Sequence, residues 1–364
     1  MNTLVIVLIA MVVLALAYVF YGRRIANKWG IDPNAETPAV KYNDGKDYVP
    51  TNGWTVFSHQ FSSIAGAGPV TGAIQAAVFG WVPVLLWILI GGVFFGAVTD
   101  FGALYASVKN KGKSMGMLIE QYIGKLGRKL FTIFCWLFSL LVIAVFADMV
   151  SGTFTAFDAD TGVKLPAAAA NGSAGMVSIM FMVFAVIFGL LQKKFDISGW
   201  KEFVLGVVFI VASFAIGIVC PITLGKDAWS YVVFAYIFVA AIMPIWLMKQ
   251  PRDFMTTIMF VCMIAGAVVG LIIGHPTMNL PAYTGFNNAK LGTMFPILFV
   301  TVACGAVSGF HSLVSSGTSS KTIANEKDML KVGYGAMILE SLLAVLALCV
   351  AGAAASKSGV PADG

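Results

Sequence analysis

The sequence predicts an all-α fold, a polytopic bundle of membrane-spanning helices, and three observations predict it. The 364 residues are 59% hydrophobic and only 11% charged, and their mean hydropathy is +0.88, whereas a water-soluble domain of this length is far more polar. The apolar residues form runs of about 20, which is the length of a helix that crosses a bilayer. The basic residues lie between these runs, so the pI of about 9.0 reflects membrane topology and does not indicate nucleic-acid binding.

Ten spans follow from these runs. They lie at about 3–21, 55–79, 82–108, 130–150, 173–191, 200–222, 230–248, 254–274, 294–314 and 333–354. With the N-terminus outside, the cytoplasmic segments hold 19 of the 23 Lys and Arg residues and the outer segments hold the other 4, as the positive-inside rule requires. The first run is followed, not preceded, by Arg23 and Arg24, which favours a retained helix over a cleaved signal peptide.

Polar segments and cysteines outside this pattern have simple interpretations. Residues 115–130 are too polar to span, and they predict either a helix on the cytoplasmic surface or an ordinary connector. The outer loops are 151–172 and 275–293, and His275 is expected to be exposed in the second. The cysteines fall inside apolar runs without metal or redox spacing, so we interpret them as small buried apolar residues. They are Cys135, Cys220, Cys262, Cys304 and Cys349.

The second span carries the features of an interrupted helix. His59, Ser62 and Ser63 lie at membrane depth, and the stretch Gly66–Pro69 follows them. Glycine loosens a helix, and proline removes a hydrogen-bond donor and clashes with the preceding turn. Interrupted membrane helices usually line the binding site of a transporter, because their freed backbone groups need a partner.

The ninth span carries a second polar stripe. Ser308, His311, Ser312 and Ser315 have the spacing i, i+3, i+4 and i+7, so they share one face of a continuous helix, which Ser319 extends. The serines are also consistent with ordinary packing between helices, and each histidine is also consistent with an uncharged residue in the protein core. Ionisable groups inside spans nevertheless suggest a function by default. Asp100 and Glu340 are further groups of this kind, either for coupling to a proton or cation or for a hydrogen bond between helices.

Six blocks spread over most of the chain resemble the carbon starvation protein A (CstA) family of bacterial membrane proteins. The blocks are DGKDYVPTN (44–52), SHQFSSIAGAGP (58–69), GAVTDF (96–101), ACGAVSGFHSLVSSGT (303–318), TIANE (322–326) and VGYGAMILE (332–340). Members of the family often have a second histidine where this chain has Gln60 and alanines where it has Ser62 and Ser63. They often have Thr-Pro where this chain has Ser319-Ser320, and they are usually longer.

The resemblance implies a fold of the leucine-transporter type, with two inverted five-helix repeats and an extra N-terminal helix. Residues 1–364 then form one transporter domain. It contains a cytoplasmic loop at 22–54, a first repeat at 55–222 and an incomplete second repeat at 230–354. In this scheme the second and ninth spans lie side by side, and Pro244 marks a second discontinuous helix in the seventh span.

These considerations select the candidate site. Substrate contacts are predicted at His59, Ser62, Ser63, Gly66, Gly68, Pro69 and His311. Ion coupling is predicted at Ala65, Asp100, Ser312, Ser315, Ser316, Thr318 and Glu340. Hard cations take oxygen ligands, and histidine titrates near physiological pH, so the coupling ion is expected to be H⁺ or Na⁺. Two histidines on different helices with no nearby cysteine are a weak signal for a metal.

The predicted function is secondary active transport in the bacterial inner membrane, with a periplasmic N-terminus. The resemblance implies import of small peptides, or of pyruvate and related carboxylates, during carbon starvation. We expect the bilayer and this substrate as partners and no cofactor besides the coupling ion. A GxxxxGK[ST] motif is absent from the sequence. The alternatives are an intramembrane enzyme that uses His59 or His311 with Asp100, or a starvation sensor built on the same polar centre.

Overall fold

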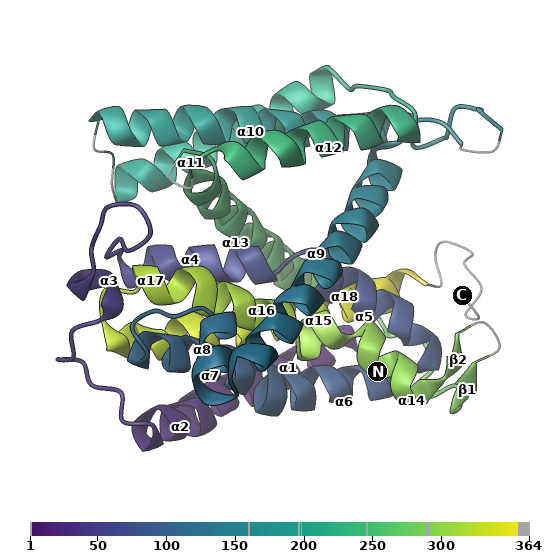
Figure 1. The fold of residues 1–364 in the computed structure, drawn as a ribbon. Helices are drawn as coiled ribbons and strands as arrows, with labels where there is room; N and C mark the ends of the chain where they lie inside the picture. The colour runs from purple at the N-terminus through teal and green to yellow at the C-terminus, as the bar shows by residue number, and fades with distance from the viewer. Residues whose placement is uncertain are drawn as a thin grey trace. The chain divides into compact units, whose positions relative to one another are not determined.

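The regular structure is almost entirely helical (Figure 1). The computed structural model describes residues 2–158, 161–195, 197, 199–244, 247–288 and 291–355. Among them, seven continuous helices are long and apolar enough to cross a membrane, namely Thr3–Lys28, Trp81–Lys109, Lys125–Phe154, Ala168–Phe195, Trp200–Val219, Lys249–Gly274 and Glu326–Ala354. The strands β1 (Asn287–Asn288) and β2 (Gly292–Thr293) form one short antiparallel pair. The predicted all-α polytopic bundle is therefore confirmed.

The chain divides into two compact units. The first combines Met1–Tyr122 with Phe260–Gly364, and the second is Ile123–Met259. This division differs from the boundary between repeats predicted at 222–230. The inverted-repeat scheme stays a prediction.

The second unit is built from long helices that meet at glycine and aromatic contacts. They are α9 (Lys125–Phe154), α10 (Ala168–Phe195), α11 (Trp200–Val219), α12 (Lys226–Ile242) and the start of α13 (Lys249–Gly274). A Cβ on Gly217 of α11 would lie 3.0 Å from the carbonyl oxygen of Ser173, so α10 and α11 approach closely. The buried Trp229 of α12 packs edge-on against Phe154 of α9, with 5.1 Å between ring centroids.

Two predictions about these segments are wrong. Helix α12 ends at Ile242, earlier than the predicted 248, and Met243 is extended with φ −70° and ψ 143°. Because proline disfavours the helical conformation in the residue before it, Pro244 follows the end of α12 and does not interrupt the helix. Of the two alternatives for residues 115–130, a single helix over the whole segment is excluded, because α8 (Met115–Tyr122) ends before α9 begins at Lys125, and the connector remains.

The first unit is organised around α18 (Ala336–Ala354). Its other continuous helices are α1 (Thr3–Leu16), which runs through a π-helical segment into α2 (Arg23–Lys28), and α6 (Trp81–Ile90), which runs through another into α7 (Ala97–Lys109). Helix α18 is apolar on nearly every side, as expected of a buried helix, and Ala344, Val345 and Leu348 are fully buried. They share one cluster with Val7 of α1 and Ile88 of α6. The polar residues Glu340 and Ser341 on α18 are therefore surrounded by protein.

Two helices of the first unit are interrupted halfway. Helix α4 (Gly53–Ile64) is followed by Ala65 (φ −75°, ψ 68°) and Gly66 (φ −93°, ψ −153°) before α5 (Ala67–Ala76) begins. The ninth span consists of α14 (Met294–Thr301), α15 (Ala303–Ala306), α16 (Gly309–Val314), a π-helical segment at Ser315–Ser319 and α17 (Ser320–Thr322). Between α15 and α16, Val307 (φ −159°) and Ser308 (φ −125°) are extended. Ser308 therefore lies at the break and not, as predicted, on a continuous helix with His311, whereas His311, Ser312, Ser315 and Ser319 share one helical stretch that becomes π-helical at Ser315.

The two interrupted helices lie side by side, as predicted. A Cβ on Gly68 would lie 2.7 Å from Cys304 Sγ, and a Cβ on Gly72 would overlap the carbonyl oxygen of Thr301. A Cβ on Gly305 would come within 3.5 Å of Pro69 Cα. Helix α5 thus touches α14 and α15 nearly backbone to backbone, which small residues allow in membrane helix pairs.

The loops of the first unit gather at two ends. At one end, the amide N–H of Thr3 donates to the carbonyl of Pro276 (3.0 Å) and that of Trp81 to Pro281 (3.1 Å). At the other end, the N–H of Thr51 donates to the carbonyl of Thr322 (2.8 Å). The predicted topology places the loops of the first end outside and those of the second end inside. The structure confirms that these loops of the first unit lie at opposite ends. Which end faces the cytoplasm stays a prediction.

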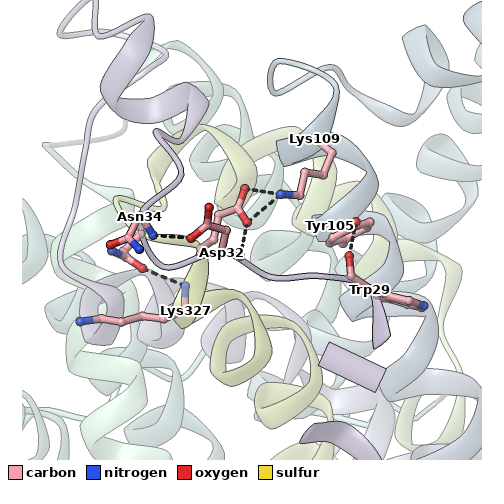
Figure 2. Close-up of polar contacts among 8 residues, drawn as sticks. Trp29, Asp32, Asn34, Tyr105, Lys109 and Lys327 are labelled. Carbon is pink, nitrogen blue, oxygen red and sulfur yellow. Dashed lines mark hydrogen bonds and ion pairs between the residues drawn. The ribbon is translucent and has the colours of Figure 1, made fainter. Parts of the chain in front are cut away.

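Glu326 organises the predicted inner end, where Figure 2 shows Lys109 and Asp32 close together. Both of its carboxylate oxygens lie 2.8 Å from Lys109 Nζ at the end of α7. One of them also accepts the N–H of Asp32 at 3.0 Å, and nearby the hydroxyl of Tyr105 donates to the carbonyl of Trp29 at 2.6 Å (Figure 2). Glu326 is 3% exposed. One buried carboxylate therefore ties the segment after α2 to the end of α7.

Asp44 shapes the loop that precedes α4. Its Oδ1 accepts the backbone N–H groups of Lys46, Asp47 and Tyr48, each at 2.9 Å. These hydrogen bonds, that from Tyr48 foremost, hold the pKa of Asp44 below its usual range. The hydroxyl of Tyr48 donates in turn to the carbonyl of Lys111 at 3.1 Å. The DGKDYVPTN block is therefore a structural connection at this end of the unit.

We expect Glu326→Gln to lower the free energy of unfolding by about 2 kcal/mol, because Lys109 loses its partner in a partly buried place. The matched control is Lys226→Ala, since the Lys226–Asp148 pair is solvent-exposed and such pairs contribute about 0–1 kcal/mol. Unfolding of both variants would be followed by circular dichroism in detergent. Equal shifts for the two variants would contradict the role given to Glu326.

Candidate ion-coupling and substrate site

Three ionisable side chains meet in the interior of the first unit. His311 Nδ1 lies 3.1 Å from Asp100 Oδ2, and His311 Nε2 lies 3.5 Å from Glu340 Oε2. Asp100 and Glu340 are fully buried, and His311 is 1% exposed. Isolated buried carboxylates are strongly disfavoured, so the imidazole between them is what makes the arrangement tenable. The sequence predicts these residues separately, and the structure brings them together as one cluster, hereafter the acid–histidine cluster.

Irregular helix segments position all three members of this cluster. Asp100 lies on α7 just after the π-helical segment Gly91–Gly96. Glu340 lies on α18 just after the π-helical segment Leu330–Gly335. His311 lies on α16, between the Val307–Ser308 break and the π-helical segment Ser315–Ser319. Such π-bulges occur frequently at functional sites, since each adds a residue and re-aims the side chains that follow.

Cys304 is a neighbour of the cluster that sequence reasoning missed. Its Sγ lies 3.6 Å from Glu340 Oε1, so its interpretation as an inert apolar residue is wrong. Cys349 is buried as predicted, but Cys220 and Cys262 are exposed. The only signal in the sequence is that Cys304 precedes His311 in the same polar block. Because an extended break separates the two residues, no helical spacing could show that they meet.

Two serines of the predicted stripe, Ser315 and Ser319, are hydrogen-bonded to Gln60. The side-chain amide of Gln60, on α4, donates to Ser315 Oγ at 2.9 Å and accepts from Ser319 Oγ at 2.7 Å. Ser316 Oγ donates to the carbonyl of Ser312 at 2.8 Å, and Thr318 is partly buried. These hydroxyls join α4 to the ninth span, which is the packing alternative. A cation site at Ser315, Ser316 and Thr318 stays a prediction.

The end of α4 presents hydroxyl groups beside its break. In the described part of the chain, the buried Oγ atoms of Ser62 and Ser63 have no hydrogen-bond partner. Ala65 is fully buried and Gly66 is exposed. Among the described residues, no side chain caps the start of α5, so its first N–H groups lack a side-chain partner there. A helix N-terminus with free N–H groups and nearby hydroxyls favours a negatively charged group.

The remaining predicted residues lie outside the acid–histidine cluster. His59 is buried on α4, but both ring nitrogens of His311 face carboxylates, so the two histidines do not form one pair. Gly68 and Pro69 face Cys304 and Gly305, respectively, which gives them a role in close packing. Ser312 is buried next to His311 in sequence, and its Oγ has no hydrogen-bond partner among the described residues.

Together these features define a class of protein. It is a polytopic helical membrane protein with two interrupted helices in contact and a buried acid–histidine cluster at one of them. Residues 2–359 match the family model described as carbon starvation protein CstA. The chain belongs to the carbon starvation protein CstA family.

Curated relatives agree with this assignment. The chain is 37% identical to the pyruvate/proton symporter BtsT of Escherichia coli, over 96% of this chain and 49% of that protein. It is 37% identical to the peptide transporter CstA of Escherichia coli, over 95% of this chain and 50% of the relative. It is 35% identical to the peptide transporter CstA of Bacillus subtilis, over 96% and 58%. The chain thus spans about half the length of the curated relatives it matches. These relatives are named as transporters, not enzymes, and no solved structure matches the chain.

Proposed function

We propose that this chain supplies the substrate and coupling sites of a secondary transporter in the bacterial inner membrane, which imports small peptides or carboxylates such as pyruvate with protons. The observation that carries the proposal is the acid–histidine cluster beside two interrupted helices. Contact is continuous from the α4–α5 break to the cluster: Gly68 touches Cys304, and Cys304 touches Glu340. Substrate and coupling ion then bind in adjacent places, as coupling requires.

The charge of the cluster favours the proton as the coupling ion. Two carboxylates and one imidazolium carry a net charge of −1, and one further proton makes the cluster neutral. Because the cluster is buried, its net charge is unfavourable. Gain or loss of a proton therefore changes whether the cluster is more stable buried or exposed to water. Two of the serines predicted for ion coupling, Ser315 and Ser316, are already hydrogen-bonded to Gln60 and to the backbone, respectively. One relative named a pyruvate/proton symporter supports the same choice.

We propose that the substrate's carboxylate binds at the start of α5. The unpartnered hydroxyls of Ser62 and Ser63 and the N–H groups that follow Gly66 suit a carboxylate of pyruvate or of a peptide C-terminus. No cationic side chain is needed, because the positive end of the helix dipole supplies the attraction.

The test is uptake into proteoliposomes with proton and sodium gradients imposed separately. We expect an inward proton gradient to drive accumulation of labelled pyruvate, dipeptides or tripeptides, and a protonophore to abolish it. Accumulation driven by sodium alone would remove the proton from the mechanism. Absence of all uptake by folded chain would contradict the proposal as a whole.

We expect Gly66→Ala to reduce uptake at least tenfold without changing stability beyond about 0.5 kcal/mol. Gly66 has negative φ and open space around it, so the fold tolerates a methyl group, whereas a substrate that approaches the backbone does not. The control is Gly266→Ala on α13, where the added methyl group also meets open space. Normal uptake by Gly66→Ala, measured at several substrate concentrations, would move the substrate site away from this break.

A further inference from the structure

We propose that Cys304, His311 and Glu340 form a binding site for a transition-metal cation of the Zn²⁺ type. The proposal goes beyond the transport function, since metal binding can be measured in detergent without any gradient. It rests on the distances between the three side chains, on the orientation of the imidazole and on the charge of the ligand set.

The distances fit neighbouring ligands of a tetrahedral ion. One ligand atom from each of the three residues lies within 4.8 Å of the other two. Zinc–ligand bonds of about 2.0–2.3 Å at tetrahedral angles place nitrogen and oxygen ligands about 3.4 Å apart, and sulfur and oxygen ligands about 3.6 Å apart. The measured separations are 3.5 Å from His311 Nε2 to Glu340 Oε2 and 3.6 Å from Cys304 Sγ to Glu340 Oε1. Because these two separations run to different oxygens of Glu340, the carboxylate would bind the ion through both oxygens, or turn so that one oxygen faces both Cys304 and His311.

Asp100 orients the imidazole for this role. With its Nδ1–H directed to Asp100 Oδ2 at 3.1 Å, a neutral His311 presents the lone pair of Nε2 to Glu340 and Cys304. Histidines that bind metals almost always donate their other ring N–H to a carboxylate or carbonyl group in this way. Asp100 therefore acts as a positioning residue and is not itself a ligand.

The charges and burial favour a cation that also accepts sulfur. A thiolate and the Glu340 carboxylate neutralise a divalent ion, while the Asp100 carboxylate keeps its hydrogen bond to the imidazole N–H. Glu340 Oε2 has no hydrogen-bond partner within the described chain. The mixed sulfur, nitrogen and oxygen set suits Zn²⁺ or Co²⁺ and not Mg²⁺ or Ca²⁺, which take oxygen alone. Three protein ligands leave the fourth position open, as in exchangeable zinc sites. In the sequence no cysteine adjoins either histidine, but in the folded protein Cys304 lies beside His311.

A consequence follows for transport, and this step rests on the proposed function. Zinc would occupy the imidazole and carboxylate that exchange the coupling proton, so Zn²⁺ is expected to inhibit proton-driven uptake. Binding without inhibition would leave the metal site standing and would count against the proton route. Inhibition that persists in Cys304→Ser would assign the effect to another place.

The binding experiment uses the complete chain, purified in detergent and stripped of metal with a chelator. Titration with Co²⁺ should produce the absorption of a tetrahedral site together with a thiolate-to-cobalt charge-transfer band, and Zn²⁺ should displace it. Cys304→Ser should remove the charge-transfer band, while Cys349→Ser, a buried cysteine outside the cluster, should keep it. Asp100→Asn should weaken binding about 10–100-fold, the usual effect of losing such a partner.

Two results would overturn the proposal. One is the absence of saturable Co²⁺ binding by folded protein. The other is a charge-transfer band that survives Cys304→Ser and disappears when the exposed Cys220 or Cys262 is replaced. A measurement on the unaltered chain guards against misfolded variants: Zn²⁺ should slow alkylation of Cys304 at least tenfold, as read by mass spectrometry, and leave Cys220 and Cys262 unprotected.

Discussion

His311→Asn is expected to abolish proton-driven uptake and to lower the free energy of unfolding by about 3–5 kcal/mol. The asparagine side chain is too short to contact Asp100 and Glu340 together, so two buried carboxylates lose the group that compensates them. Removing one partner of a buried ion pair has a destabilising effect of this size. Uptake would be measured in proteoliposomes under an inward proton gradient, and unfolding by circular dichroism in detergent.

A matched control and a compensating variant separate misfolding from loss of mechanism. His275→Asn changes an exposed loop histidine with φ 39°, a conformation that asparagine accepts, so it should leave both measurements unchanged. The triple variant Asp100→Asn, His311→Asn and Glu340→Gln removes every charge of the cluster and should regain much of the lost stability. It should not regain proton-driven accumulation. If it does, the acid–histidine cluster is a structural feature and not the coupling site.

Gly72→Ala is expected to lower the free energy of unfolding by about 3 kcal/mol and to abolish uptake. Its methyl group would overlap the carbonyl oxygen of Thr301, which belongs to the backbone of α14 and cannot rotate away. The overlap is therefore relieved only if α5 and α14 separate. The expected loss of stability is accordingly at the upper end of the range usual for overpacking. The separation would also move Cys304 away from Gly68 and disturb the contact between the two interrupted helices.

The control for this variant is Gly270→Ala on α13, where no atom lies within 4 Å of the added methyl group. Replacing a helical glycine by alanine where the methyl group meets open space stabilises the protein by about 0.5–1 kcal/mol. Stability of Gly72→Ala equal to that of Gly270→Ala would show that α5 and α14 do not approach as closely as described. The same unfolding assay serves for both variants.

Local properties of the sequence were enough to predict much of this protein. Apolar runs of spanning length predicted a polytopic helical bundle, and Thr3, Pro276 and Trp81 meet at one end of the first unit, where the predicted topology puts its outer loops. Gly66 and Pro69 predicted the first break because glycine and proline weaken a helix wherever they occur. The second break, at Val307 and Ser308, has no proline and was missed. Pro244 was placed inside a span although it follows the end of α12.

The candidate site shows where such reasoning stops. Asp100, His311 and Glu340 were each recognisable as ionisable residues within apolar runs, but Asp100 and His311 are 211 positions apart in sequence. Their meeting depends on the direction in which each helix turns its side chains. The π-helical segments at 91–96 and 330–335 reset that direction for Asp100 and Glu340, since one added residue rotates the following face by about 100°. The extended break at Val307 and Ser308 does so for His311. Cys304 and Gln60 acquire their partners through the same rotations.

The fold class, the loops at each end of the first unit, the first interruption and the inventory of buried ionisable residues were all predictable, because each depends on composition or spacing within one segment. The grouping of those residues into a site came from the fold: His311 lies between Asp100 and Glu340, Cys304 joins them, and His59 does not pair with His311. A contact between helices depends on the rotation and close approach of two segments at once, and no periodicity within either segment specifies both.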